Sequence, residues 1–141
     1  MSCYAVIDTN VLVSGLLSEN DTAATVQVLG RMIAGEITPL YSDEIIAEYR
    51  EVLSRKKFKF SSQMIEYLLS VIDKYGILIE PTLTGIVLPD MKDLPFYEVV
   101  LEKKNDGAYL ITGNAKHFPE EPFIVSARQM IDILDNNVSP T

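Results

Sequence analysis

The sequence has one cysteine, Cys3, and one histidine, His117. A single cysteine excludes a disulfide within the chain, and its place at the start of an apolar run favours a packed core residue over a nucleophile. The lone histidine has no histidine or cysteine partner at zinc-ligand spacing, so we expect a surface side chain rather than a catalytic base. We therefore expect any catalytic residues to be side chains other than Cys3 and His117.

Long apolar runs and glycine-rich loops are also missing. No run approaches the roughly 18 apolar residues of a membrane span, and no secretory signal pattern opens the chain, so we expect a cytoplasmic protein with no membrane partner. No glycine-rich loop ends in Gly-Lys-Ser or Gly-Lys-Thr, and no spaced glycines follow the first apolar run. These absences argue against a P-loop nucleotide hydrolase and a dinucleotide-binding enzyme.

Basic residues are scarce, since 12 Lys and Arg stand against 20 Asp and Glu, for a net charge of -8. This balance argues against a broad nucleic-acid footprint. Five of the twelve nevertheless fall within residues 50–59, and we expect this basic segment to contact RNA phosphates. The alternative is a solvated helix end whose cations complement the helix dipole. The segment comprises Arg50, Arg55, Lys56, Lys57 and Lys59.

The 141 residues suit one domain, 1–141, with a hydrophobic fraction of 48%. Short apolar runs alternate with helical patterns, which predicts an α/β fold with a parallel sheet covered on both faces. Strands are expected at 4–7, 38–41, 76–80, 108–112 and 123–125. Helices are expected directly after the first strand and at 22–34, 43–56, 61–74, 94–104 and 126–136.

The first apolar run, residues 5–7, ends abruptly at Asp8. An acid where a buried strand passes into a helix lies at the carboxyl edge of a parallel sheet, which is where open α/β folds place their ligands. Asp8 is therefore the first candidate for chemistry. The alternative is that Asp8, Thr9 or Asn10 simply caps the following helix.

A second acid, Glu48, lies within the helix expected at 43–56. At 100° per residue, Glu48 lies about 100° from the centre of the apolar stripe, whereas Asp43, Glu44 and Glu51 lie about 120° to 160° away. Glu48 is thus the acid closest to the buried boundary. The alternative is an ordinary solvated glutamate.

Two further polar positions stand at element boundaries. Asp93, with Asp90 three residues before it, precedes the helix expected at 94–104, where the alternative role is an N-cap. Asn114 follows the strand expected at 108–112, where the alternative role is an ordinary turn residue. Its place at a carboxyl end matches that of Asp8.

Carboxylates that converge on one crevice would repel one another and any phosphodiester. Hard divalent cations prefer such oxygen ligands and complete their shell with water and substrate phosphate. With a cation, the same cluster could activate water and neutralise charge on a phosphodiester. The pattern therefore predicts a Mg²⁺ or Mn²⁺ site.

Four stretches resemble the PIN-domain ribonucleases, and in particular the small prokaryotic members that act as toxins of toxin–antitoxin pairs. They occur in family order and span most of the chain, at residues 6–15, 42–49, 90–96 and 109–114. The resemblance implies a three-layer α/β/α fold with a five-stranded parallel sheet. It also implies a metal-dependent endoribonuclease that cleaves single-stranded RNA to 5′-phosphate and 3′-hydroxyl ends, a homodimer, and a cognate antitoxin protein.

Carried over by position, the resemblance makes Asp8, Glu48 and Asp93 the catalytic ligands of Mg²⁺ or Mn²⁺. Asn114 stands where many members have a fourth aspartate, and an amide adds no charge, so activity could be weaker or need more metal. Auxiliary roles, such as orienting the ligands by hydrogen bonds, fall to Thr9, Asn10, Asp90 and Thr112.

Two other functions compete with this interpretation. Asn114 and the acidic composition are compatible with a nucleic-acid or protein-binding module that keeps the fold without turnover. A metal-dependent phosphatase of small esters is the other alternative. The dehalogenase-type phosphatases typically need a second acid two residues after the first, and that position is Asn10 here.

Overall fold

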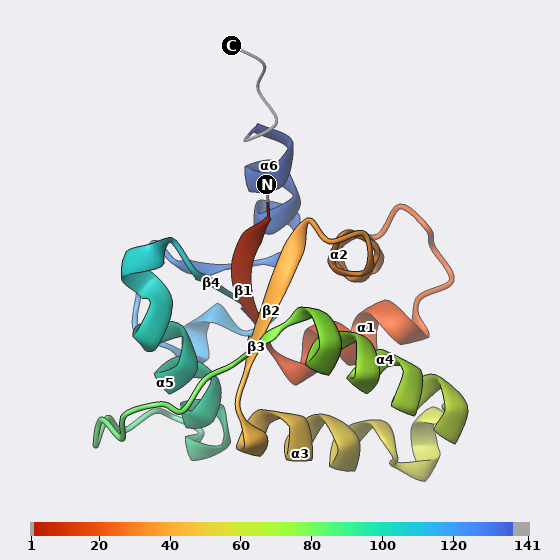
Figure 1. Ribbon diagram of the computed structural model, residues 1–141, viewed down its shortest axis with the longest axis horizontal. Helices are drawn as coiled ribbons and strands as arrows, with labels where there is room; N and C mark the ends of the chain where they lie inside the picture. The colour runs from red at the N-terminus through yellow and green to blue at the C-terminus, as the bar shows by residue number, and fades with distance from the viewer. Residues whose placement is uncertain (1, 137–141) are drawn as a thin grey trace.

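The computed structural model describes residues 2–136. At its centre lies a parallel sheet with the strand order β3-β2-β1-β4-β5 (Figure 1). All five expected strands are present. The expected strand 76–80 is shorter than predicted, because only two of its residues pair with the neighbouring strand. The strands are β1 (Cys3–Ile7), β2 (Ile37–Tyr41), β3 (Ile77–Leu78), β4 (Tyr109–Ile111) and β5 (Ile124–Val125).

Helices cover both faces of the sheet. Figure 1 shows α5 on one side and α1, α2 and α4 on the other, with α3 across the end where the strands finish. The predicted three-layer α/β/α fold is therefore confirmed. No helix of residues 2–136 is long and apolar enough to cross a bilayer. The helices are α1 (Thr9–Leu17), α2 (Ala24–Ile33), α3 (Asp43–Leu53), α4 (Ser62–Tyr75), α5 (Leu94–Lys103) and α6 (Ala127–Asn136), with short 3₁₀ turns η1 (Lys56–Phe58), η2 (Met91–Asp93), η3 (Lys104–Asp106) and η4 (Ala115–His117).

The helix expected to run to residue 56 ends earlier. The backbone N–H of Ser54 closes the last turn of α3 on the carbonyl of Arg50, and η1 then forms a separate turn. Lys59 follows with a positive φ of 59°, which stops further helical growth. Most of the basic segment consequently lies on a bent connection rather than along a helix.

Strand β1 is the buried centre of the sheet. Ala5, Val6 and Ile7 are at most 1% exposed, as expected for a parallel strand covered on both faces. Burying an aliphatic side chain of this size contributes about 1.5–3 kcal/mol. The chain therefore delivers the next residue, Asp8, into a largely buried position at 5% exposure.

Gly15 lets α1 approach α2 closely. A Cβ atom at this position would lie 2.9 Å from the carbonyl oxygen of Thr25 and 2.7 Å from a methyl carbon of Leu29. Such separations are too short for a real Cβ, so only glycine fits. This packing holds α1, which begins directly after Asp8, in place above the end of the sheet.

Candidate active site

One open hollow of about 500 Å³ lies at the carboxyl edge of the sheet. It is formed by side chains from the end of β1, from α1, from α3 with the following η1, and from the segment around η2. We call it the carboxylate cleft, because four acidic residues line it. These are Asp8, Glu48, Asp90 and Asp93.

The β1–β4 register positions Asp8. Ile7 lies opposite Ile111, and the backbone N–H of Asp8 continues the ladder to the carbonyl of Ile111 at 2.9 Å. The next residue of each strand is then adjacent, and the Thr112 hydroxyl donates to Asp8 Oδ2 at 2.7 Å. Asp8 occupies the N-cap position of α1, but its side chain makes no capping hydrogen bond. The capping alternative is therefore wrong for Asp8.

Burial makes Asp8 hard to ionise. The pKa of this carboxyl is raised to about 6, mainly by burial and in part by the nearby Asp93 and Glu48 carboxylates, while the hydrogen bond from Thr112 acts in the opposite direction. A buried carboxylate with acidic neighbours is the kind of group that a bound cation would stabilise.

Glu48 lies where the helical pattern predicted. It is half-buried at the cleft, whereas Asp43, Glu44 and Glu51 are exposed. The Thr9 hydroxyl donates to Glu48 Oε2 at 2.5 Å, which joins α1 to α3. Burial is the main cause that raises the pKa of Glu48 as well.

Tyr49 holds α3 against the end of β1. Its hydroxyl donates to the backbone carbonyl of Ile7 at 2.5 Å, and its ring packs near that of Phe96 with centroids 6.1 Å apart. Tyr49 is 2% exposed. Because Glu48 precedes Tyr49 directly, this contact also holds the backbone from which the Glu48 side chain extends. The sequence pattern could not identify this hydrogen bond, since the partner of Tyr49 is a backbone atom 42 residues away.

Asp93 is not the helix cap that its position suggested. It precedes α5, but its side chain caps nothing, and its Oδ2 lies 3.2 Å from His117 Nδ1. Asp90 caps η2 instead, by accepting from the backbone N–H of Lys92 at 3.0 Å. Pro95 occupies the first turn of α5, where a proline is tolerated. Burial and the neighbouring Asp90 raise the pKa of Asp93, while His117 acts in the opposite direction.

His117 is therefore more than the surface residue we expected. Its ring is 35% exposed, but it faces Asp93 from η4. A signal was present in the sequence: His117 lies three residues after Asn114, just past the carboxyl end of β4, the edge that carries Asp8. A histidine in such a loop belonged among the site candidates.

The structure does not bring Asn114 into the cleft. Asn114 is exposed, it is not among the residues that line the cleft, and its backbone N–H donates to the Thr112 hydroxyl at 3.0 Å. Asn10 lines the cleft and accepts from the backbone N–H of Gly113 at 3.3 Å. The polar residues after β1 and β4 thus hold each other in place.

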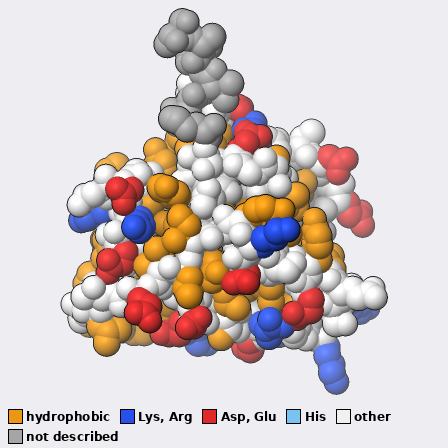
Figure 2. Space-filling view, in the orientation of Figure 1, with side chains coloured by type: hydrophobic (Ala, Val, Ile, Leu, Met, Phe, Trp, Pro, Cys, Tyr) orange, Lys and Arg blue, Asp and Glu red, His pale blue; other side chains and the backbone are white. Residues whose placement is uncertain are grey.

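The basic segment divides into parts with different surroundings. Arg55 lines the cleft and pairs with Glu51, whereas Arg50 pairs with Glu66 of α4 and lines a different hollow. The remaining members, Lys56, Lys57 and Lys59, are exposed. Figure 2 shows acidic and basic side chains interspersed on the described surface of one face, without a continuous basic stripe.

Lys92 is a cleft residue that the sequence pattern did not predict. It lies between Asp90 and Asp93 and lines the cleft beside them. The signal was its place within the acidic cluster, where a cation can meet a phosphate that the carboxylates would otherwise repel.

The donor set of the cleft fits a hard divalent cation chemically. Asp8, Glu48 and Asp93 each have a raised pKa with burial as the main cause, so a cation would relieve the cost of ionising them. As they stand, no three His, Cys, Asp or Glu side chains of residues 2–136 lie close enough together to hold an ion. Each carboxylate contacts a different neighbour instead, so metal binding requires side chains to turn towards one another.

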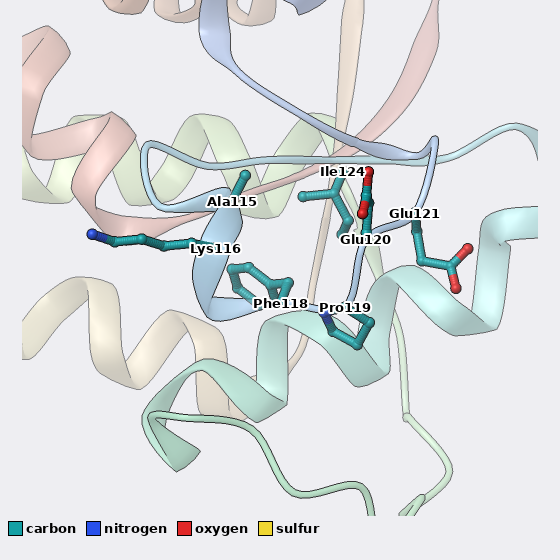
Figure 3. A pocket seen from close by; sticks show the side chains of 7 residues that line it. All are labelled: Ala115, Lys116, Phe118, Pro119, Glu120, Glu121 and Ile124. Atoms are coloured by element: carbon teal, nitrogen blue, oxygen red, sulfur yellow. The ribbon is translucent and has the colours of Figure 1, made fainter.

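A separate hollow of about 290 Å³ lies along the connection from β4 to β5 (Figure 3). It is lined by Lys116, Glu120 and Glu121 together with apolar side chains. None of the candidate ligands lines this hollow, whereas Asp8, Glu48 and Asp93 all line the carboxylate cleft.

Comparison with known proteins gives the family of the chain. The family model of the PIN domain matches residues 4–116, which includes every candidate ligand. No curated protein and no solved structure matches the chain. The chain belongs to the PIN domain family, whose members are generally nucleases that need metal ions.

Proposed function

We propose that this protein is an endoribonuclease that cleaves single-stranded RNA in the carboxylate cleft with the help of Mg²⁺ or Mn²⁺. The observation that carries the proposal is that Asp8, Glu48 and Asp93, from three different elements, line one open cleft. The acids of the cleft are of the type that hard cations prefer.

In this proposal Asp8, Glu48 and Asp93 hold the ion. When bound, it supplies Lewis-acid catalysis and neutralises charge on the phosphodiester. The Thr112 hydroxyl orients Asp8, and His117 orients Asp93, through contacts of 2.7 and 3.2 Å. Such supporting hydrogen bonds keep ligand oxygens aimed at one point.

The cations of the cleft bind the substrate backbone. Arg55 and Lys92 line it, and the exposed Lys56 and Lys57 continue from Arg55. Changing Arg55, Lys56 and Lys57 to Gln should reduce the slope of log affinity against log salt by about 0.7 for each phosphate that these cations neutralise. An unchanged slope would remove these three residues from the RNA interface.

The direct test is cleavage of a single-stranded RNA by purified protein in Mn²⁺ and in EDTA. Asp8→Asn should reduce the metal-dependent rate at least tenfold, about 1.4 kcal/mol of transition-state stabilisation. Asp21→Asn is the matched control, because Asp21 is an exposed aspartate outside the cleft. Products should carry 5′-phosphate and 3′-hydroxyl ends.

Three outcomes would contradict the proposal. Equal cleavage rates for wild type and Asp8→Asn would show that Asp8 has no catalytic role. RNA binding without any cleavage would favour a binding module. Hydrolysis of a small phosphate ester with no action on RNA would favour a phosphatase.

The resemblance described above also motivates a cellular role, and we include it in the proposal: the protein acts as the toxin of a toxin–antitoxin pair and works as a homodimer. Expression of the wild type in a bacterial host should arrest growth, whereas Asp8→Asn should not. Growth that is identical for both would refute the toxin role. A monomer at micromolar concentration in sedimentation would refute the dimer.

A further inference from the structure

The carboxylate cleft has an apolar end. Further along the helices from the acids, it is lined by Val13 and Leu17, one and two turns after Thr9 on α1, by Val52, one turn after Glu48 on α3, and by Phe58 of η1. Leu17 is 50% exposed. Holding a metal ion and a phosphate requires no such apolar side chains, and apolar surface at the rim of a cleft is typical of a ligand-binding site.

The ring of Phe58 is held in position within this apolar end. The Phe60 ring stacks on it with centroids 5.6 Å apart and an angle of 17° between the planes. Lys57 Nζ lies 5.1 Å from the Phe58 centroid. Phe60 does not line the cleft, whereas Phe58 does. Phe58 is therefore an aromatic residue of the cleft whose ring is supported by Phe60, with the cation of Lys57 over it.

We propose that the apolar end of the carboxylate cleft binds one unpaired nucleobase, which stacks on Phe58 while the adjoining phosphate meets Arg55 and Lys92. The inference rests on the proposed function, because it states how the same RNA strand lies in the same cleft. Proteins that bind single strands combine cations along the backbone with aromatic rings under the bases. Both features line this one cleft.

The subsite also fits the single-stranded substrate of the proposed function. The cleft of about 500 Å³ is of the size that accepts small ligands, so a nucleotide can enter it. A base within a duplex has both faces stacked and cannot reach Phe58 without leaving its neighbours. The occupant is therefore an unpaired base, and stacking makes the subsite tolerant of base identity.

The test compares two strands of equal length and charge: an oligouridylate and the same ribose-phosphate chain without bases. Their affinities are measured by fluorescence anisotropy in EDTA, so that cleavage plays no part. Wild type should bind the oligouridylate about tenfold more tightly than the abasic strand. Phe58→Ala should bind both strands equally. Tyr67→Ala is the control, because Tyr67 is 57% exposed but lies outside the cleft, and it should keep the preference.

A second pair of variants separates stacking from simple packing. Phe58→Trp keeps a flat aromatic surface and should keep the preference for the oligouridylate. Phe58→Leu keeps only apolar bulk and should lose most of this preference. This pair carries the test if Phe58→Ala does not fold, which a melting curve reveals.

Two results would refute the proposed subsite. One is equal affinity of wild type for both strands, and the other is an equal loss of affinity for both strands in Phe58→Ala or Phe58→Leu. The outcome is independent of catalysis. A protein that prefers the oligouridylate but cleaves no RNA in Mn²⁺ would refute the proposed nuclease and leave the subsite standing.

Discussion

Replacing Asp8 by asparagine should stabilise the metal-free protein at neutral and alkaline pH. The Asp8 carboxyl is 5% exposed and has a pKa raised to about 6 from an ordinary 3.8, mainly by burial. A difference of about two pKa units corresponds to about 3 kcal/mol at pH values where the folded protein must ionise the group. Asn keeps an oxygen that can accept from the Thr112 hydroxyl, so most of this cost disappears in the variant.

The pH dependence follows from the direction of the shift. Below about pH 4 the carboxyl is protonated in both the folded and the unfolded chain, and its burial costs no ionisation energy. Between about pH 4 and 6 the unfolded chain releases the proton first, so the folded protein loses stability as the pH rises. Above about pH 6 the full cost is present, and the gain from Asp8→Asn should be largest there.

The measurement is thermal unfolding in EDTA over pH 4 to 8. A gain of 1 kcal/mol raises the melting temperature of a domain this size by about 4 °C, so Asp8→Asn should melt about 4–12 °C above wild type at pH 8. The gain should shrink towards pH 4. Asp21→Asn, which changes an exposed aspartate, should follow wild type throughout.

Mn²⁺ in large excess should reverse the ranking. At about 1,000 times its dissociation constant an ion that binds only the folded protein adds about 4.1 kcal/mol, which exceeds the cost of ionising Asp8, and Asp8→Asn should lose most of that gain. The reasoning is refuted if Asp8→Asn is less stable than wild type at every pH, since the ionised carboxylate would then be a favourable partner. If the melting temperatures of both proteins are the same with and without Mn²⁺, the proposed metal site is refuted.

Three further changes test individual side-chain contacts of the fold. His117→Ala removes the contact with Asp93 and should weaken Mn²⁺ binding about tenfold in calorimetry; an unchanged affinity would make that contact incidental. Tyr49→Phe leaves a buried carbonyl without its donor and should cost about 1–3 kcal/mol in urea unfolding, whereas no loss would show that the carbonyl finds another partner. Glu98, buried on α5, accepts from the backbone N–H and the hydroxyl of Thr84, so Glu98→Ala should speed amide hydrogen exchange at Thr84, and unchanged exchange would contradict this role.

Local sequence patterns were enough to predict the order of helices and strands and the direction in which one acid, Glu48, faces. Alternating apolar runs and helical stretches predicted a parallel sheet between helices, because both periods are properties of neighbouring residues. The same periodicity predicted that Glu48 faces the buried boundary, since the direction of a side chain on a helix depends only on its position along that helix. The predicted ends of helices and strands were less accurate, as β3 and the end of α3 illustrate. These ends depend on the pairing of neighbouring strands and on the conformation of single turns.

The sequence alone determined the α/β architecture and the order in which acids appear at the edge of the sheet. It could not decide which polar residues meet. Asp8 contacts Thr112 rather than capping α1, and Asp93 contacts His117 rather than capping α5, while Asn114 stays outside the cleft. The two contacts join residues 104 and 24 positions apart. Only the strand register and the packing of α5 and η4 bring such residues together, because a capping bond and a distant partner compete for the same carboxylate and the folded geometry selects between them.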